Sequence, residues 1–239
     1  MITQGWLLGG QVRHDQPKGG HRSGIEPVLL AASVPARPGQ NVLEGGSGAG
    51  AALLCLAHRV PGVNGLGVER EPALAALATA NAEASGVSGL RFVAADLTAW
   101  EPAERFDHAM ANPPWHGAGT ASPDRRHEAA RRAEAGLLAR WAMRLAGGLR
   151  HRGTLTLALG AAHLADGLAA LGAAGCGSLA VLPLWPRPGR AAKLVLLRAV
   201  RGGRGPSEML PGLVLHRADG GFTAEAEAVL RGGAALPFK

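Results

Sequence analysis

The sequence predicts an α/β protein in which helices cover both faces of a mostly parallel β-sheet. Short apolar segments that are typical of strands alternate along the chain with longer segments of helical spacing. A glycine-rich turn joins the first of these strands to the next helix, and an acid or an amide comes just after several strands. The length of 239 residues fits one large domain with a substantial core.

Seven strands and the helices between them follow from the spacing of apolar residues. The expected strands are Asn41–Glu44, Asn64–Val68, Leu90–Ala94, Phe106–Ala111, Thr154–Leu159, Ser178–Leu184 and Lys193–Val200. The expected helices are a short one after Pro27, then 51–59, Pro72–Ser85, Glu128–Gly147, Ala162–Leu171 and one from about Thr223. Glu26 can cap the first helix, and Pro27 suits its first position. The last two of the seven strands are close enough in sequence to form an antiparallel pair at one edge.

Three stretches are expected along the chain. Residues 1–40 are an irregular, polar N-terminal extension, and residues 41–200 form the core of the domain. Residues 201–239 add a short strand, a turn at Asp219–Gly221 and a helix, which complete the same domain.

The charge of the chain favours a polyanionic partner. Its formal net charge is +7 and its pI is about 10.8, a balance that suits nucleic acid. Nearly all of the basic residues are arginine, however, in a chain that is also rich in alanine and glycine. A GC-rich coding sequence would give this bias without any selection for binding, so both interpretations stay open.

Cysteine use and hydropathy indicate a cytoplasmic protein without a membrane partner. Cys55 and Cys176 are far apart, lack metal-ligand spacing and have apolar neighbours, so we expect reduced, buried thiols and no metal site. The N-terminus does not resemble a signal peptide, and no uncharged apolar run reaches the roughly 18–20 residues that cross a bilayer.

The glycine-rich turn at residues 45–50 is the first candidate for a binding site. Glycines allow a ligand to approach the backbone, and this turn opens onto a helix N-terminus. Because it follows a strand, a nucleotide site is favoured over a plain tight turn. Glu44 comes directly before the glycines. A carboxylate there would repel a pyrophosphate, so the ligand is expected to carry positive charge.

Two acidic residues follow the next two strands. Glu69 ends the second strand, where a carboxylate can accept hydrogen bonds from both hydroxyls of a ribose. Asp96 follows the third strand and could accept from the exocyclic amine of an adenine. The alternative for Asp96 is a helix cap, and the alternative for Glu69 is a solvated loop charge.

The fourth strand ends in an unusual motif, "ANPPW" at residues 111–115. Two adjacent prolines cannot belong to a regular strand or to a helix interior, because each lacks an N–H and has a fixed φ. The segment is therefore expected to be stiff and extended. Such a segment can present the side chain of Asn112 and the carbonyl of Pro113 in fixed positions.

These segments, in this order and spacing, resemble the class I S-adenosylmethionine-dependent methyltransferases. "NVLEGGSGAG", "GLGVERE", "VAADL" and "FDHAMANPPW" carry the resemblance, and the Asn-Pro-Pro-aromatic signature is its specific part. Within that class the chain is most similar to the bacterial family of tRNA (adenine-N6) methyltransferases that modify valine tRNA near the anticodon. The two ends of the chain resemble that family as well.

The resemblance implies a Rossmann-like class I methyltransferase fold, with a seven-stranded, mostly parallel sheet that has an antiparallel edge strand. It implies S-adenosylmethionine as cofactor, and an N-terminal segment that covers the cofactor or substrate site. The implied catalytic residues are Asn112, Pro113, Pro114 and Trp115. The implied cofactor-binding residues are Glu44, Gly46, Gly48, Gly50, Glu69, Arg70, Asp96, Leu97 and Asn112.

The resemblance implies methyl transfer to an exocyclic amine, and the acceptor it favours is adenine N6 in tRNA near the anticodon. The Asn112 oxygen and the Pro113 carbonyl would each accept a hydrogen bond from one N–H of the amine, and Trp115 would stack on the base. Candidate RNA-binding residues are Arg125, Arg126, Arg131, Arg132, Arg187, Arg190 and Lys193, or else they form a solvated surface. The protein could be a monomer or a homodimer.

Other acceptors and other classes stay open. The same signature also serves guanine-N2 methylation of rRNA, adenine-N6 methylation of DNA and methylation of a protein glutamine amide. From other classes, the glycine turn fits an NAD-dependent oxidoreductase, and the whole fold fits a non-catalytic module that binds the cofactor or RNA.

Overall fold

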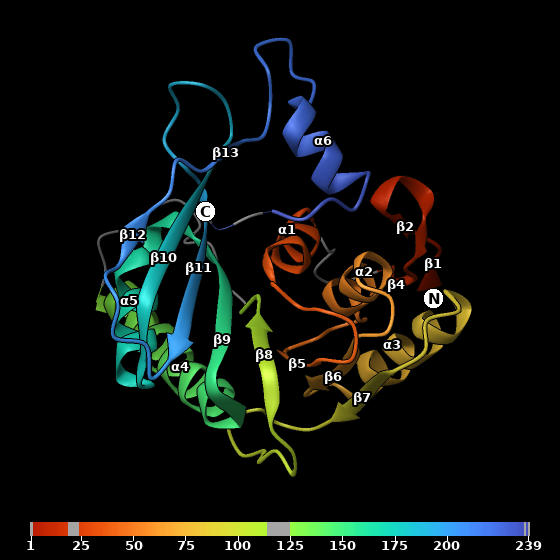
Figure 1. Ribbon diagram of the computed structural model, residues 1–239, viewed down its shortest axis with the longest axis horizontal. Coiled ribbons are helices and arrows are strands. Elements are labelled where there is room, and N and C mark those ends of the chain that lie inside the picture. Colours follow the sequence, from red (N-terminus) through yellow and green to blue (C-terminus); the bar gives the residue numbers. More distant parts are fainter. Residues whose placement is uncertain (1, 19–23, 114–124, 237, 239) are drawn as a thin grey trace.

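The computed structural model of the chain describes residues 2–18, 24–113, 125–236 and 238, and for residues 125–135 it describes the backbone alone. Most strands belong to one sheet (Figure 1). Its members are β5 (Asn41–Gly45), β6 (Asn64–Glu69), β7 (Leu90–Ala94), β8 (Phe106–Ala111), β9 (Leu149–Gly160), β10 (Cys176–Trp185), β11 (Leu194–Arg201), β12 (Glu208–Met209) and β13 (Leu213–Val214). Their order across the sheet is β12-β10-β11-β9-β8-β5-β6-β7, and β13 also pairs with β10.

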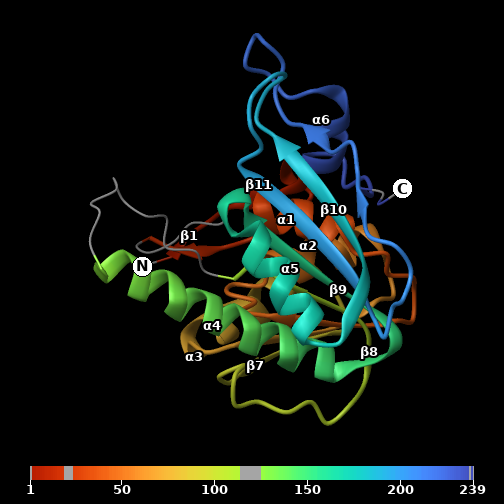
Figure 2. The same cartoon turned by 90° about the vertical axis from the view of Figure 1, so that its left-hand side faces the viewer.

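Helices cover both faces of this sheet. They are α1 (Glu26–Ser33), α2 (Ala51–Arg59), α3 (Pro72–Ala84), α4 (Arg125–Gly148), α5 (Leu164–Ala173) and α6 (Ala224–Leu230). The helices α4 and α5 pack together on one face, seen from the front in Figure 2, while α1, α2, α3 and α6 lie on the other. Each face has its own hydrophobic core, one built around α1 and α2 and the other around α4 and α5.

The predicted Rossmann-like α/β fold is confirmed, and two details of the sheet differ from the expectation. The sheet has nine strands, because two-residue strands β12 and β13 extend it beyond β10. The strands β10 and β11 are the expected antiparallel pair. However, the antiparallel strand β11 does not form the edge, since it lies between β9 and β10 and runs antiparallel to both. The sequence predicts one short strand in residues 201–239, where the structure has two, because two-residue strands are too short to give an apolar period.

The N-terminal residues, expected to be irregular, contain short paired strands. The strand β1 (Ile2–Thr3) pairs with β4 (Gln16–Pro17), and β2 (Trp6–Leu7) pairs with β3 (Val12–Arg13), both antiparallel.

The start of α1 also differs in detail. Pro27 lies in the first turn as predicted, but Ile25 is the N-cap and makes no side-chain hydrogen bond to the helix. Glu26 is already inside the helix, so it does not act as the cap. A carboxylate in the first turn still interacts favourably with the helix dipole.

Both cysteines are free and buried, as the sequence predicts. Among the described residues, no helix is both long enough and apolar enough to span a membrane. Within the same residues, no group of three or more His, Cys, Asp or Glu side chains is placed to hold a metal ion.

Candidate active site

The candidate site lies at the carboxyl ends of β5 and β8, where the connections of the sheet reverse direction. From β5 the chain passes through α2 to β6 on one side, and from β8 it passes through α4 to β9 on the other. Open α/β sheets bind ligands at such a switch point. The register pairs Gly45 with Ala111, so Asn112 and Gly46 follow side by side at the ends of neighbouring strands.

The glycine turn has the backbone conformation that only glycine adopts freely. Gly46, Gly48 and Gly50 have φ of +67°, +53° and +90°. The amides of Gly46 and Ser47 donate to the carbonyl of Val68 at 2.8 and 3.3 Å, which fixes the turn against β6. A Cβ on Gly48 would meet no atom within 4 Å, so the backbone there is open to a ligand.

Trp141 of α4 covers the start of this turn. A Cβ on Gly46 would lie 2.6 Å from Cη2 of the Trp141 indole, so any side chain at this position would clash with the ring. No pattern in the sequence indicates that a residue so far along the chain contacts the turn. Tertiary packing alone brings α4 against the end of β5.

Glu69 lies where the sequence predicts, at the end of β6 beside the glycine turn. One carboxylate oxygen, Oε2, accepts the N–H of Gly48 at 2.8 Å, and the other, Oε1, accepts the N–H of Glu71 at 2.9 Å. Each oxygen keeps a second lone pair in this arrangement. Glu69 therefore both orients the turn and can still accept hydrogen bonds from a ligand.

Glu44 is buried beneath the turn, with only 4% of its surface exposed. Burial raises the pKa of this carboxyl well above its usual value, and the negative charge of Glu69 raises it further. The N–H of Leu53 donates to the carboxylate at 3.2 Å and acts in the opposite direction. The ionised form is therefore costly while no cation is near. A positively charged group in the crevice would favour the carboxylate form.

Asp96, after β7, caps a single turn at residues 97–99, and no helix follows it before β8, so the helix cap that the sequence left open as its alternative is wrong. Its Oδ1 accepts both the N–H and the hydroxyl of Thr98 at 2.8 Å, and these hydrogen bonds hold the pKa of Asp96 below its usual value. The charge of Arg70 acts in the same direction, so Arg70 lies nearby. Within the described residues no donor contacts Oδ2, which leaves that oxygen able to accept from a ligand. Capping of this turn is thus compatible with binding a ligand.

The remaining predicted residues are placed only in part. Leu97 is buried and lies against Gly45, where a Cβ would be 2.6 Å from its Cδ2. Asn112 is half-buried and Pro113 is buried at the end of β8. Pro114 and Trp115 lie outside the described residues, as do the side chains of the arginines at 125, 126, 131 and 132.

Asn81 is a positioning residue that sequence reasoning missed. Its side chain is 1% exposed, donates to the carbonyls of Ala49 and Asp15 at 3.0 Å each, and accepts the Asp15 N–H at 3.0 Å. It therefore ties the glycine turn to the N-terminal segment. The available signal was an asparagine on the apolar face of α3, one residue before the buried Ala82 and three after the buried Ala78.

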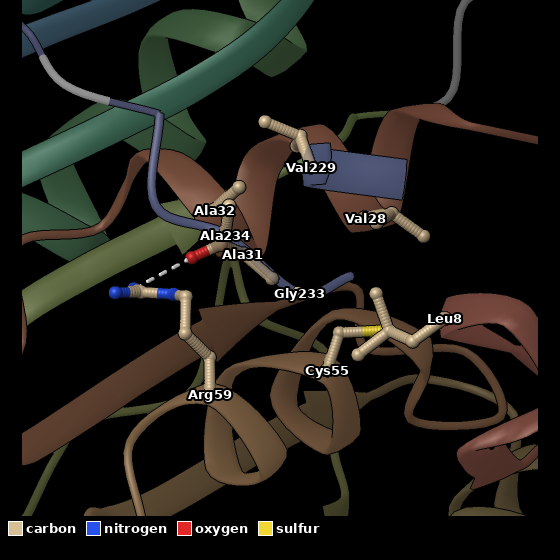
Figure 3. A pocket seen from close by; sticks show the side chains of 9 residues that line it. All are labelled: Leu8, Val28, Ala31, Ala32, Cys55, Arg59, Val229, Gly233 and Ala234. Atoms are coloured by element: carbon tan, nitrogen blue, oxygen red, sulfur yellow. Dashed lines mark hydrogen bonds between the residues drawn. The ribbon is translucent and has the colours of Figure 1, made fainter. Parts of the chain in front are cut away.

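A small cavity lies elsewhere, between α1, α2, α6 and the chain termini (Figure 3). Its walls are mostly apolar, and the guanidinium of Arg59 donates to the carbonyls of Ala31 and Val34 at 2.9 and 2.6 Å. These bonds add a donor to two carbonyls at the end of α1, where the last carbonyls of a helix lack regular partners within it. No residue of the candidate site lines this cavity, so it is a packing feature and not the ligand site.

A glycine turn between two carboxylates, at the switch point of a mostly parallel sheet, defines a Rossmann-like enzyme that binds a nucleoside ligand. Within that class, the chain belongs to the methyltransferase small domain family, whose sequence model matches residues 26–145, half of the chain. This membership decides against the NAD-dependent oxidoreductase that the glycine turn left open.

Individual relatives agree with the family. A tRNA1(Val) (adenine(37)-N6)-methyltransferase from Porphyromonas gingivalis is 34% identical over 130 residues, which cover 50% of this chain and 51% of the relative. The same enzyme from a second strain is 34% identical over 134 residues, again 50% of this chain and 51% of the relative. The chain thus spans about half the length of the curated relatives it matches.

Solved structures share the fold. A predicted O-methyltransferase from Agrobacterium tumefaciens superposes with a TM-score of 0.73 at 25% identity, over 88% of this chain and 98% of that one. TrmN from Thermus thermophilus superposes with a TM-score of 0.52 at 21% identity, over 74% of this chain and 48% of that one. These superpositions confirm the Rossmann-like methyltransferase fold.

Proposed function

We propose that this protein uses S-adenosylmethionine to methylate the exocyclic N6 of an adenine in tRNA, near the anticodon. The observation that carries the proposal is the place of Asn112 and Pro113, at the end of β8 and directly beside the glycine turn. The name of the relatives, which act on adenine 37 of a valine tRNA, supports the choice of acceptor.

The residues around the turn fit this cofactor. Glu44 is a buried carboxyl whose ionised form a ligand ammonium would stabilise. Glu69 would accept the ribose hydroxyls, and Oδ2 of Asp96 would accept the adenine amine. The Ser47 hydroxyl is buried and has no hydrogen-bond partner among the described residues, so it offers a further polar contact. When bound, S-adenosylmethionine supplies a methyl group activated by a sulfonium.

The chain's own contribution is to hold the acceptor amine. The Asn112 side-chain oxygen and the Pro113 carbonyl accept its two N–H hydrogens, which turns the nitrogen lone pair toward the glycine turn. The fixed φ of the prolines keeps both acceptors in place. Trp115, placed by the sequence motif, stacks on the base and contributes about 1–3 kcal/mol to binding.

No general base is required before the attack, because the amine is neutral. The nitrogen takes the methyl group as the sulfur–methyl bond breaks, the electron pair of that bond stays on sulfur, and the methylated nitrogen then releases one proton to water. The rate then comes from alignment, for which an error of about 1 Å can cost roughly a hundredfold. His108, the titratable residue of β8 nearest to the motif in sequence, is not placed to act as a base. It lies toward the other end of the strand, where Thr154 and Gln40 hold its ring at 2.8 and 3.1 Å.

Transfer of a radiolabelled methyl group tests the proposal. The substrates are an unmodified valine tRNA transcript, the same transcript with guanine in place of adenine 37, a DNA duplex and a glutamine-containing peptide. We expect label only in the first. Label in the DNA, in the peptide or equally in both transcripts would contradict the proposed acceptor.

Asn112→Ala tests the site itself. We expect transfer to fall at least a hundredfold while binding of S-adenosylhomocysteine changes by less than about threefold. Asn64→Ala is the matched control, because Asn64 lies at the opposite end of the sheet, where it bonds the Asn41 side chain at 3.2 Å. If Asn112→Ala transferred the methyl group at the wild-type rate, the role assigned to Asn112 would be ruled out.

A further inference from the structure

Two loops beyond β10 form one projection on the surface. The first loop joins β10 to β11 at residues 186–193, and the second joins β13 to α6 at residues 216–222. The N–H of Leu215 donates to the carbonyl of Trp185 at 2.8 Å, and that of His216 donates to Pro186 at 3.2 Å. The two loops therefore leave the sheet side by side, and we call them the double loop.

The base of the double loop is tightly built. Gly212 has a φ of +85°, and a Cβ there would lie 2.3 Å from the carbonyl oxygen of Pro183, so β13 can dock closely on β10. The indole Nε1 of Trp185 donates to Pro211 O at 3.1 Å.

The second loop is closed on itself. The N–H of Arg217 donates to the carbonyl of Gly221 at 2.8 Å, and the rings of His216 and Phe222 stack with centroids 4.8 Å apart. A loop fixed at its base and braced in this way loses little conformational entropy when it binds a partner.

The double loop concentrates positive charge. It carries Arg187, Arg190, Lys193 and Arg217 against a single carboxylate, that of Asp219. Oδ2 of Asp219 forms an ion pair with Nη2 of Arg217 at 3.2 Å. The first three are exposed, and among the described residues no carboxylate forms an ion pair with any of them. Arg187 reaches across to the second loop, since its Nη2 lies 4.0 Å from where a Cβ of Gly220 would be.

The double loop also lies at the same edge of the sheet as Asn112. The strands β8 and β9 are parallel, and β10 and β9 are both antiparallel to β11, so β8 and β10 point the same way. Figure 2 shows both loops extending beyond the end of β10. Three strand spacings separate β8 from β10, about 14 Å across the sheet.

We propose that the double loop is an arm that binds the RNA phosphate backbone and holds the substrate while its target base occupies the crevice. This inference rests on the proposed function, because it assigns the surface by which that RNA is held. Unpaired arginine and lysine side chains at the edge of the active site bind phosphates without reading the sequence. The second loop, contributed by the C-terminal segment, is part of the arm because it fixes and extends the basic surface of the first.

Binding of the valine tRNA transcript tests the arm, with S-adenosylhomocysteine affinity and transfer measured alongside. The variant Arg187→Ala/Arg190→Ala/Lys193→Ala removes three charges from the double loop. We expect tRNA affinity at 0.15 M salt to fall roughly tenfold or more and the slope of log K against log salt to fall by about 2. S-adenosylhomocysteine affinity should not change.

The matched control removes the same charge from the opposite edge of the sheet. Arg37→Ala/Arg152→Ala/Arg204→Ala replaces three exposed arginines there. We expect less than a twofold loss of tRNA affinity. An equal loss in both triple variants would mean that net charge alone binds the RNA, and would overturn the proposal.

A second variant predicts a gain. Asp219→Asn keeps an oxygen for the Gly221 N–H, which donates at 2.9 Å, but removes the charge that pairs with Arg217. We expect tighter tRNA binding, about two- to fivefold, and a steeper salt dependence. Unchanged binding in both this variant and the double-loop triple variant overturns the arm. If instead the wild-type protein binds tRNA through the arm but does not methylate it, the proposed function fails and the arm stands.

Discussion

Glu44 and Asp107 are carboxylates on the neighbouring strands β5 and β8, but they lie toward opposite edges of the sheet and differ in their surroundings. Burial raises the pKa of Glu44 well above its usual value. Burial also acts to raise the pKa of Asp107, but hydrogen bonds from the Asn41 N–H and from Arg150 outweigh it and lower the pKa. We call the side of the sheet where the parallel strands begin the amino edge, and the side where they end the carboxyl edge. At the amino edge the charge of Asp107 is balanced within the protein, whereas at the carboxyl edge the charge of Glu44 is left for a ligand to balance.

The arginines of the two edges show the same contrast. At the amino edge, Arg105 and Arg201 donate to the carbonyl of Gly147 at the end of α4, and Arg150 pairs with Asp107. In the double loop at the carboxyl edge, Arg187 and Arg190 have no such acceptor among the described residues. An arginine-rich composition therefore does not by itself identify a binding surface, because many arginines serve the fold.

The largest expected effect concerns acid stability and the buried His108 of the amino edge. The pKa of His108 is lowered to about 4, mainly by burial. The charge of Asp107 opposes this shift, and the charges of Arg198 and Arg37 add to it. The unfolded chain takes up this proton near pH 6.5 and the folded chain only near pH 4, so stability falls between these values. At pH 4.5 the loss is on the order of 2–3 kcal/mol.

Urea unfolding of wild-type protein and His108→Asn at pH 7 and pH 4.5 measures this effect. The variant should be less stable than wild type at pH 7, and the difference should shrink by about that amount at pH 4.5. A difference that does not depend on pH would show that His108 does not resist protonation in the folded state.

The next effect concerns Glu44→Gln at the carboxyl edge. Loss of the charge should weaken S-adenosylhomocysteine binding roughly ten- to a hundredfold, the value of a hydrogen bond to a charged group. The unliganded variant should be no less stable than wild type at pH 7. Because the folded-state pKa is raised, Glu44 costs stability as pH rises, and this cost disappears toward pH 4. Calorimetry and urea unfolding check both parts, and wild-type affinity in the variant would contradict the role of Glu44.

Asp107→Asn should have a smaller effect of the opposite kind: it should lower stability and leave ligand binding unchanged. The substitution removes the ion pair with Arg150, so the free energy of unfolding at pH 7 should fall by about 1 kcal/mol. The loss should fade below about pH 4, because a carboxyl with a lowered pKa stabilises the fold only while it is ionised. S-adenosylhomocysteine affinity should stay unchanged. A change in that affinity would break the contrast between the two edges.

The smallest effect is expected for Arg152→Gly at the amino edge. Arg152 is exposed and has a φ of +67°, a conformation that is strained for any residue with a Cβ. Glycine relieves the strain at some cost in chain entropy, so stability should rise by about 0.5 kcal/mol. Thermal unfolding measures the gain, and tRNA affinity should not change. A drop in tRNA affinity would place RNA at the edge that the comparison assigns to the fold.

Much of the site could be predicted from the sequence, because its signals are local. A strand followed by glycines, and acids or an amide just past strand ends, place Gly46, Glu69 and Asn112 at one edge of a parallel sheet, where the structure has them. Trp141 and Asn81 could not be found in this way. Each reaches the turn from another helix, and the period of a helix does not say what its buried face will contact.

The sequence by itself determined the class of fold and the crevice, since alternating strand and helix periods allow few ways to cover a parallel sheet. It also placed basic residues in the link after β10 but left two interpretations for them. Only the tertiary structure shows which arginines bond the end of a helix and which face solvent. It alone also shows that the second loop of the double loop lies beside the first. The physical reason is that pairing of charges depends on neighbours distant in the chain, whereas apolar period and glycine conformation are properties of consecutive residues.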